Sequence, residues 1–511
     1  MNTSKHQKTG GVFSSVKSIW LHLKHFLPAV RGNVGITFSL SMLPLVTLVG
    51  GGLDYSSAIT MRQRLAHAID SAALAVGRAH DASASEAQAI AEQVFNANLS
   101  TFTNMALNEL SVNVTPSLVT VSATASIPTD FLGLVGIDNI SISVSNEVMR
   151  SNRKIELVLA LDNTGSMNSG GKMTAMKNAA KDLVEILFNG ESVSDKVKIG
   201  LVPFSQSVNV GSQFKNASWI DKNGLSSING ENFSPKTDHF TLFDKTSNGS
   251  WRGCVEARPA PYDTTDAFPT SSTPDTLFVP YFAPDEPDKG GSYPNKYLKD
   301  KVSGSAAKRQ KSTKKYKNKS VNNGGNSRGP NYLCTTPPIT PLINSKSNLL
   351  SSINSFYAQG WTHIPMGLSW GWRVLSPALP FSEGAPYDDD ENVKAMVLLT
   401  DGANTAAPRN NHNKSYYTAY GYLAKGRLGT TSSSTAVTKL NQRTAALCEN
   451  IKQAGIRLYT ITFNLNNNTI KNLMRNCASS PSMYYNSPTN AQLATAFHTI
   501  AGDLNKLRLS K

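Results

Sequence analysis

Cysteine is scarce in this 511-residue sequence, and none occurs before residue 254. No two cysteines form a C-x-x-C pair and no histidine stands at ligand spacing from them, so a zinc site is a poor interpretation. An even number at wide spacing predicts two disulfides in an oxidising compartment, with four buried free thiols as the alternative. The four residues are Cys254, Cys334, Cys448 and Cys477.

Acidic residues are absent from two basic stretches, residues 1–31 and 301–328. Together these stretches account for most of the formal net charge of +15. Nucleic-acid binding is the obvious interpretation of such clusters, but neither stretch carries stacking aromatics or a known binding motif. We therefore expect no nucleic-acid partner. The first stretch is interpreted as a cytoplasmic tail that sets membrane topology, and the second as a solvated loop.

Charged residues are also absent from residues 32–53. The stretch has the length of about 20 residues that a bilayer-spanning helix needs, which predicts a transmembrane helix at residues 32–54. Lysines precede it and Asp54 follows it, so the positive-inside rule keeps the tail in the cytoplasm and exports the bulk of the chain. A cleaved signal peptide is the competing interpretation. It is disfavoured because the charged tail is long and no small-x-small cleavage site follows.

Residues 55–150 combine two hydrophobic periods. Apolar residues three to four apart, between Met61 and Val76, predict a helix that continues beyond the membrane. Ser83 and Glu86 form a capping box that predicts the start of a second helix. Between residues 110 and 148 the pattern changes to strict alternation, which predicts antiparallel strands with one buried face. A membrane helix, a continuing helix and a small sheet is a pilin-like order of elements.

Strand-like and helix-like segments alternate in residues 151–209 and 340–511. This alternation predicts an α/β domain with a doubly wound, mainly parallel sheet. Residues 210–339 interrupt it and lack sustained periodicity. They are too many for a loop, which predicts an inserted subdomain with little apolar core, bracketed by Cys254 and Cys334. The acidic turn at residues 285–288 is expected to be solvated, with calcium binding as the alternative.

Three polar side chains follow the apolar run that ends at Asp162. Asp162, Thr164 and Ser166 offer three hard oxygens from one short turn, the ligand type that magnesium, manganese and calcium prefer. Thr362 stands at a later loop-to-helix start, and Asp401 ends another apolar strand. In a parallel sheet the three loops emerge at the same edge, where open α/β sheets bind ligands. The sequence therefore predicts a divalent-cation site there.

These five residues, in this order, resemble the metal-ion-dependent adhesion site of the von Willebrand factor A domain. The family pattern is Asp-x-Ser-x-Ser, then a distant Thr and a distant Asp. Thr164 replaces the usual serine and keeps its hydroxyl. The resemblance implies that the hydroxyls bind a divalent cation directly, with Mg²⁺ first and Mn²⁺ or Ca²⁺ as alternatives. It also implies an open coordination position for a partner's carboxylate. A degenerate site without metal is the other interpretation.

The order of elements as a whole resembles the TadG-like proteins of bacterial tight-adherence (Flp) pilus assembly. The resemblance implies a single-pass inner-membrane protein with a cytoplasmic N-terminus and a periplasmic body. It implies a part in assembling or anchoring a pilus. Its partners would be other pilus-assembly or envelope proteins, bound through the metal site, and the lipid bilayer, through one helix. The residues that carry the resemblance are Gly32-Asn33-Val34, the membrane exit at Gly50–Asp54-Tyr55, the alanine-rich helix, Cys254-Val255-Glu256-Ala257-Arg258-Pro259, and the pair Cys448 and Cys477.

We expect reversible binding and no enzymatic activity. Mostly neutral ligands leave a bound ion electrophilic, so an incoming carboxylate gains a strong charge interaction. His363 is a candidate general base, but a lone histidine beside a ligand threonine is more often a supporting or packing residue. Two alternatives stay open. One is a periplasmic hydrolase in which Asp162 and Asp401 hold a catalytic ion. The other is a structural pilin-like subunit cleaved after Gly32, although Thr37 replaces the glutamate of prepilins and favours an uncleaved anchor.

Overall fold

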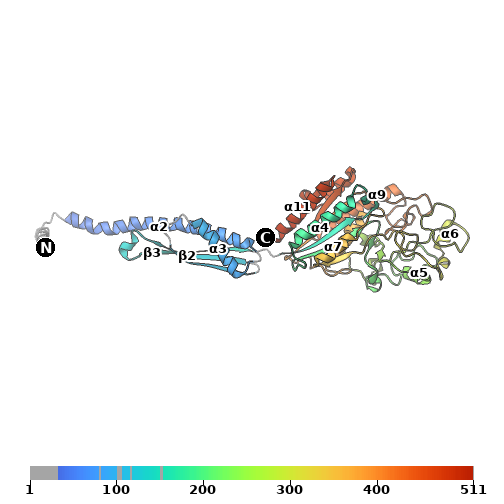
Figure 1. Ribbon diagram of the computed structural model, residues 1–511, viewed down its shortest axis with the longest axis horizontal. Helices are drawn as coiled ribbons and strands as arrows, with labels where there is room; N and C mark the ends of the chain where they lie inside the picture. The colour runs from blue at the N-terminus through green and yellow to red at the C-terminus, as the bar shows by residue number, and fades with distance from the viewer. Residues whose placement is uncertain (1–32, 80–81, 100–105, 116–117, 150–152, 510–511) are drawn as a thin grey trace, which may run out of the picture. The chain divides into compact units, whose positions relative to one another are not determined.

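The computed structural model describes residues 33–79, 82–99, 106–115, 118–149 and 153–509 (Figure 1). The basic tail at residues 1–31, and Gly32 of the prepilin-like start, lie outside the described residues. The chain divides into two compact units, residues 1–151 with residue 511, and residues 152–510.

The first unit is built on one long helix, α2, which spans Asn33–Arg78 without a break. The first half of α2 is apolar and exposed, and Val34 and Leu48 each keep 79% of their surface. Among the described residues, α2 is the one helix long and apolar enough to cross a membrane. An exposed apolar surface of this size is unfavourable in water. This half of α2 therefore requires a covering that the described residues of its own unit do not supply.

The second half of α2 packs with α3 against a small antiparallel sheet (Figure 1). The predicted helical seam is confirmed, since Leu65, Ile69 and Val76 are fully buried. The capping box is confirmed as well: the Ser83 N–H donates to Glu86 Oε2 over 2.8 Å, and the Glu86 N–H donates to Ser83 Oγ over 3.3 Å. The elements are α3 (Ala84–Leu99), β1 (Ala106–Val114), β2 (Leu118–Pro128), the 3-10 helix η1 (Leu132–Val135) and β3 (Asn139–Met149), with strand order β1-β2-β3.

The second unit is organised around a six-stranded sheet of order β11-β10-β9-β4-β5-β8. Numbered along the chain, the strands lie in the order 3-2-1-4-5-6, and all are parallel except β8 at one edge. This is the doubly wound, mainly parallel sheet that the sequence predicts. The strands are β4 (Lys154–Asp162), β5 (Val197–Phe204), β8 (Thr340–Ile343), β9 (Asn392–Thr400), β10 (Arg457–Phe463) and β11 (Tyr484–Ser487).

Helices cover both faces of this sheet. Alternate side chains of β4 point to opposite faces, so Leu157 and Leu159 pack with α4, α7 and α11, while Val158 and Ala160 pack with α8, α9 and α10. A disulfide between Cys448 and Cys477 joins α9 to the end of α10. The first layer contains α4 (Lys172–Phe188), α7 (Lys346–Asn354) and α11 (Asn490–Leu509), and the second α8 (Ile364–Leu375), α9 (Ser433–Gln453) and α10 (Asn468–Cys477).

The segment between β5 and β8 has little regular structure, but it has a substantial core. The expectation of a small apolar core is wrong, because aromatic side chains of this segment are buried together with the α8 side of the sheet. Phe278 lies 4.7 Å from Trp370 of α8, measured between ring centroids, and Cys254 is bonded to Cys334. The regular elements here are β6 (Val208–Asn209), α5 (His239–Lys245), β7 (Cys254–Val255) and α6 (Ala306–Lys311).

Short 3-10 helices complete the second unit. They are η2 (Gly165–Asn168), η3 (Ser212–Asn216), η4 (Tyr262–Thr264), η5 (Pro274–Thr276), η6 (Thr313–Tyr316), η7 (Leu423–Lys425) and η8 (Pro481–Met483).

The acidic turn of the same segment is buried, which corrects the expectation of a solvated turn. Asp285 is fully buried and Glu286 keeps 1% of its surface. The Lys315 ammonium lies 2.6 Å from Asp285 Oδ2, and backbone N–H groups of Tyr297 and Leu298 donate to Asp285 Oδ1. An internal cation and backbone donors therefore satisfy this carboxylate in place of water. Lys315 is itself buried, although the sequence predicts that residues 301–328 form a solvated loop.

Candidate metal centre

The candidate site lies at the point where the sheet reverses its strand order. Strands β4 and β9 are parallel neighbours, with Leu161 opposite Leu399. Asp162 therefore ends one strand beside Thr400, which ends the other. Chains leave such a pair in opposite directions, and we call the position between the two loops at this carboxyl edge of the sheet the crevice.

Backbone hydrogen bonds between loops bring Thr362 to this crevice. The Gly165 N–H donates to the Gly360 carbonyl over 3.0 Å, and the Thr405 N–H donates to the Thr362 carbonyl over 3.0 Å. Gly360 has φ of +94°, and a Cβ there would lie 2.0 Å from Gln206 Oε1. Glycine is therefore required where the chain turns toward the Asp162 loop.

The five predicted oxygen-bearing side chains lie together. A hydrogen-bonded chain runs from Thr362 Oγ1 to Thr164 Oγ1 (3.2 Å), to Ser166 Oγ (3.1 Å) and to Asp401 Oδ1 (2.6 Å). Asp162 joins it by accepting the Thr164 N–H at Oδ1 over 2.8 Å. Three loops distant in sequence thus present hydroxyl and carboxylate oxygens to one small volume.

Lys172 is a member of the site that the sequence did not reveal. Its ammonium lies 2.8 Å from Asp401 Oδ2, and the lysine side chain is only 11% exposed. Lys172 is the first residue of α4, directly after Gly170 and Gly171, a position that is usually solvated. The available signal was its position at the start of the helix that directly follows the Asp162 loop. Two carboxylates and one ammonium leave a formal charge of −1 in the crevice.

The donor set fits a hard divalent cation. Hydroxyl and carboxylate oxygens are the ligands of magnesium, manganese and calcium, and the residual negative charge favours a cation. Among the described residues no three His, Cys, Asp or Glu side chains form a metal-binding group. A cation at this edge would therefore depend on the hydroxyls of Thr164, Ser166 and Thr362 together with the two aspartates.

The electrostatics of the crevice also favour a cation. Burial, together with repulsion by Asp401, raises the pKa of Asp162 from its ordinary value of 3.8 to about 7. Hydrogen bonds from Thr164 and Thr400 act in the opposite direction and are outweighed. The ionised form of Asp162 is thus unfavourable without an additional positive charge.

Without a cation, stability should fall as the pH rises from about 4 to about 7. In this window folded Asp162 retains a proton that the unfolded chain has already released, so raising the pH favours unfolding. The measurement is thermal unfolding of the full chain in detergent and EDTA across this range, with Asp162→Asn as the matched variant. Asp162→Asn should gain stability relative to the parent as the pH rises. Parallel pH profiles would contradict the assigned environment of Asp162.

His363 is held as a neutral side chain. Burial lowers its pKa to about 4, and Nε2 lies 3.0 Å from the Thr405 carbonyl. This contact ties the start of α8 to the loop after β9. His363 thus has a supporting position next to Thr362, in agreement with the packing role expected for it.

One family model matches part of the chain. Residues 32–79, less than a tenth of the sequence, match the family described as Putative Flp pilus-assembly TadE/G-like. This match covers the whole of α2, both its apolar half and the half that packs against the small sheet. No curated protein matches the chain.

Several solved structures are similar to this chain at low sequence identity. The vWF domain of the type V pili tip protein Mfa5 from Porphyromonas gingivalis is 10% identical, with a TM-score of 0.34, and the match covers 70% of this chain and 98% of that one. The pilus adhesin SpaC from Lactobacillus rhamnosus GG is 12% identical, with a TM-score of 0.33 and 79% of this chain covered, but the chain spans only 35% of SpaC.

A third structure is the proximal thread matrix protein 1 from the mussel byssus, with a zinc-occupied MIDAS motif. It is 12% identical, with a TM-score of 0.30, and the match covers 70% of this chain and 47% of that one. The second unit has a doubly wound, mainly parallel α/β fold, as the sequence predicts, and its strand order carries that assignment.

Proposed function

We propose that this chain is a membrane-anchored component of Flp pilus assembly that binds a partner protein through a divalent cation. The observation that carries the proposal is the convergence of five oxygen-bearing side chains at the switch point of the sheet. Asp162, Thr164, Ser166, Thr362 and Asp401 would hold the cation, most favourably Mg²⁺. The cation would supply an electrophilic centre for an Asp or Glu of the partner.

The proposed setting is a bacterial inner membrane. The match of residues 32–79 to the pilus-assembly family supports the pilus context, and the exposed apolar half of α2 supports a single-pass anchor. The basic tail before the span favours a cytoplasmic N-terminus, and two disulfides favour a periplasmic body. In this organisation residues 1–31 are the tail, 32–54 the span and 55–150 a pilin-like region. Residues 151–209 and 340–511 form the metal-binding domain, with residues 210–339 inserted.

The environment of the crevice favours binding over hydrolysis. Its imidazole, His363, is neutral and contacts a backbone carbonyl, and its ammonium, Lys172, is paired with Asp401. General acid–base catalysis needs a group that reaches a substrate proton, and neither of these groups is free to do so in this arrangement. Asp162 is also engaged, since its carboxylate accepts the Thr164 N–H and the Thr400 hydroxyl. The hydroxyls of Thr164, Ser166 and Thr362 would instead serve as ligands of the proposed cation.

The proposal is tested by removing one hydroxyl without changing shape. Thr362→Val should abolish stabilisation of the full chain by magnesium, because one of the proposed direct ligands is lost. The same variant should lose chelator-sensitive crosslinks to envelope proteins in cells, measured by mass spectrometry. Thr460→Val is the matched control, since Thr460 is a buried threonine on β10 that donates to the Met474 carbonyl, outside the candidate site.

Two outcomes would overturn the proposal. Magnesium stabilisation that survives in Thr362→Val would remove Thr362 from the site. Crosslinks that persist in EDTA would separate partner binding from the metal.

A further inference from the structure

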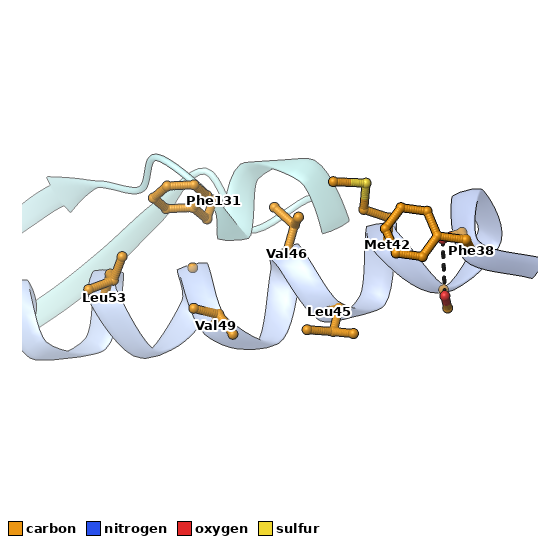
Figure 2. A pocket seen from close by; sticks show the side chains of 9 residues that line it. Phe38, Met42, Leu45, Val46, Val49, Leu53 and Phe131 are labelled. Carbon is orange, nitrogen blue, oxygen red and sulfur yellow. Dashed lines mark hydrogen bonds between the residues drawn. The ribbon is translucent and has the colours of Figure 1, made fainter. Parts of the chain in front are cut away.

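The loop between β2 and β3 lies against the apolar half of α2 (Figure 2). Phe131 and Leu132 sit over two consecutive glycines of the helix. A Cβ on Gly50 would lie 2.2 Å from Phe131 Cγ, and a Cβ on Gly51 would lie 2.9 Å from Leu132 Cδ2. Glycines at these two positions are therefore what allows the loop to approach the helix.

Asp54 fixes the start of this loop at the end of the apolar run. Its carboxylate accepts three backbone N–H groups, from Asp130 (3.2 Å), Phe131 (2.9 Å) and Leu132 (2.8 Å). The chain then runs back along α2 toward Val46, which lines the same groove as Phe131. At 1.5 Å per helical residue, Val46 lies about 12 Å before Asp54 along the helix axis.

The loop satisfies much of its own backbone. The N–H groups of Leu134, Gly136 and Ile137 donate to carbonyls of Phe131, Gly133 and Leu132, each over 3.1 Å. Together with the three N–H groups held by Asp54, most backbone donors of the loop are paired. Irregular backbone requires such internal pairing wherever water is absent.

The side chains of the loop are apolar and exposed. Leu134, Val135 and Ile137 keep 58%, 53% and 48% of their surface. No charged or polar side chain occurs in residues 131–137, and acids, Asp130 and Asp138, stand directly at both ends. Phe131 and one face of α2 also enclose an apolar groove of about 450 Å³ (Figure 2).

We propose that residues 131–137 are a second membrane-embedded element, an apolar wedge in the leaflet where α2 leaves the bilayer. The proposal rests on α2 as the membrane anchor and goes beyond it. We assign lipid as the material that covers the wedge, because its exposed side chains extend the apolar surface of the part of α2 that a bilayer would cover. The two acids mark the depth at which the wedge meets the headgroups. Two elements, α2 and the wedge, would then contact the membrane. Together they would fix the orientation of the pilin-like sheet relative to the membrane surface.

The test uses fluorescent probes on the full chain in phosphatidylethanolamine–phosphatidylglycerol vesicles. All four native cysteines are in disulfides, so a single new cysteine can be labelled with an environment-sensitive probe. Leu134→Cys reports on the wedge, Leu48→Cys on the anchor, and Ser145→Cys, exposed on β3, on the water-facing sheet. Spin-labelled lipids with the quencher near the top of the acyl chain are then added.

Quenching at Leu134→Cys should reach at least half of that at Leu48→Cys, with little at Ser145→Cys. If Leu48 is quenched while Leu134 behaves like Ser145, the wedge is wrong and the anchor stands. A blue-shifted but unquenched Leu134 probe would mean that protein, such as a second copy of the chain, covers the loop, and would overturn the lipid assignment. An unquenched Leu48 probe would remove the anchor and the wedge together.

Discussion

Lys172→Met is expected to destabilise the metal-free protein and to raise its affinity for magnesium at least ~10-fold, a gain of about 1.4 kcal/mol. The parent crevice has two carboxylates and one ammonium, and the variant would have two carboxylates alone. Removing one partner of a buried ion pair costs about 3–5 kcal/mol, because the other charge stays buried. A divalent cation would neutralise the unpaired negative charge, so magnesium should stabilise the variant more than it stabilises the parent.

The measurement is thermal unfolding of the full chain in detergent, titrated with magnesium from EDTA. Lys181→Met is the matched control, a lysine further along α4 that is only partly buried. It should change neither the metal-free stability nor the magnesium affinity. Equal magnesium affinity in Lys172→Met and the parent would contradict competition between the ammonium and the metal.

A third outcome is that magnesium stabilises Lys172→Met but not the parent protein. Lys172 would then itself be the cation of the native crevice. The hydroxyls would in that case form a polar network around an ion pair, and the metal-dependent part of the proposed function would fail.

The sequence predicts the doubly wound sheet because its long strands are continuous apolar runs between amphipathic helices. β4 and β9 each end in a polar residue at the same edge, so strand order alone brings Asp162 near Asp401. The short strands β8 and β11 span four residues each, too few for any period to be recognised. They are defined by pairing with β5 and β10, which is a tertiary property.

Buried charges were the least predictable feature. Lys172 and Lys315 stand in segments whose composition is typical of solvated chain, yet both are buried against aspartates. Sequence pattern reports the average environment of a segment, whereas burial of one lysine depends on a carboxylate from a distant loop. The aromatic core of residues 210–339 was not predicted for a related reason, because its residues follow neither helical nor strand spacing.

Lys315→Met is expected to destabilise the body by about 3–5 kcal/mol near neutral pH. Both side chains of the Lys315–Asp285 pair are fully buried, and the ammonium also donates to the Asp285 carbonyl over 2.8 Å. Burial already raises the pKa of Asp285 from 3.8 to about 6, against the lowering effect of Lys315. Losing that lysine raises the pKa further, so the ionised carboxylate becomes still less favourable in the fold.

The pH dependence separates this mechanism from simple loss of packing. A carboxyl with a raised pKa in the folded state lowers stability as the pH rises from its unfolded pKa toward its folded pKa. The loss of stability in Lys315→Met should therefore shrink as the pH falls toward about 5, where Asp285 is protonated. Lys314→Met removes the exposed neighbouring lysine and should change stability by less than about 0.5 kcal/mol. Lys315→Met/Asp285→Asn should recover much of the loss, because no charge is left unpaired. A pH-independent defect that the double variant does not relieve would show that the Lys315 side chain matters for its volume rather than for its charge.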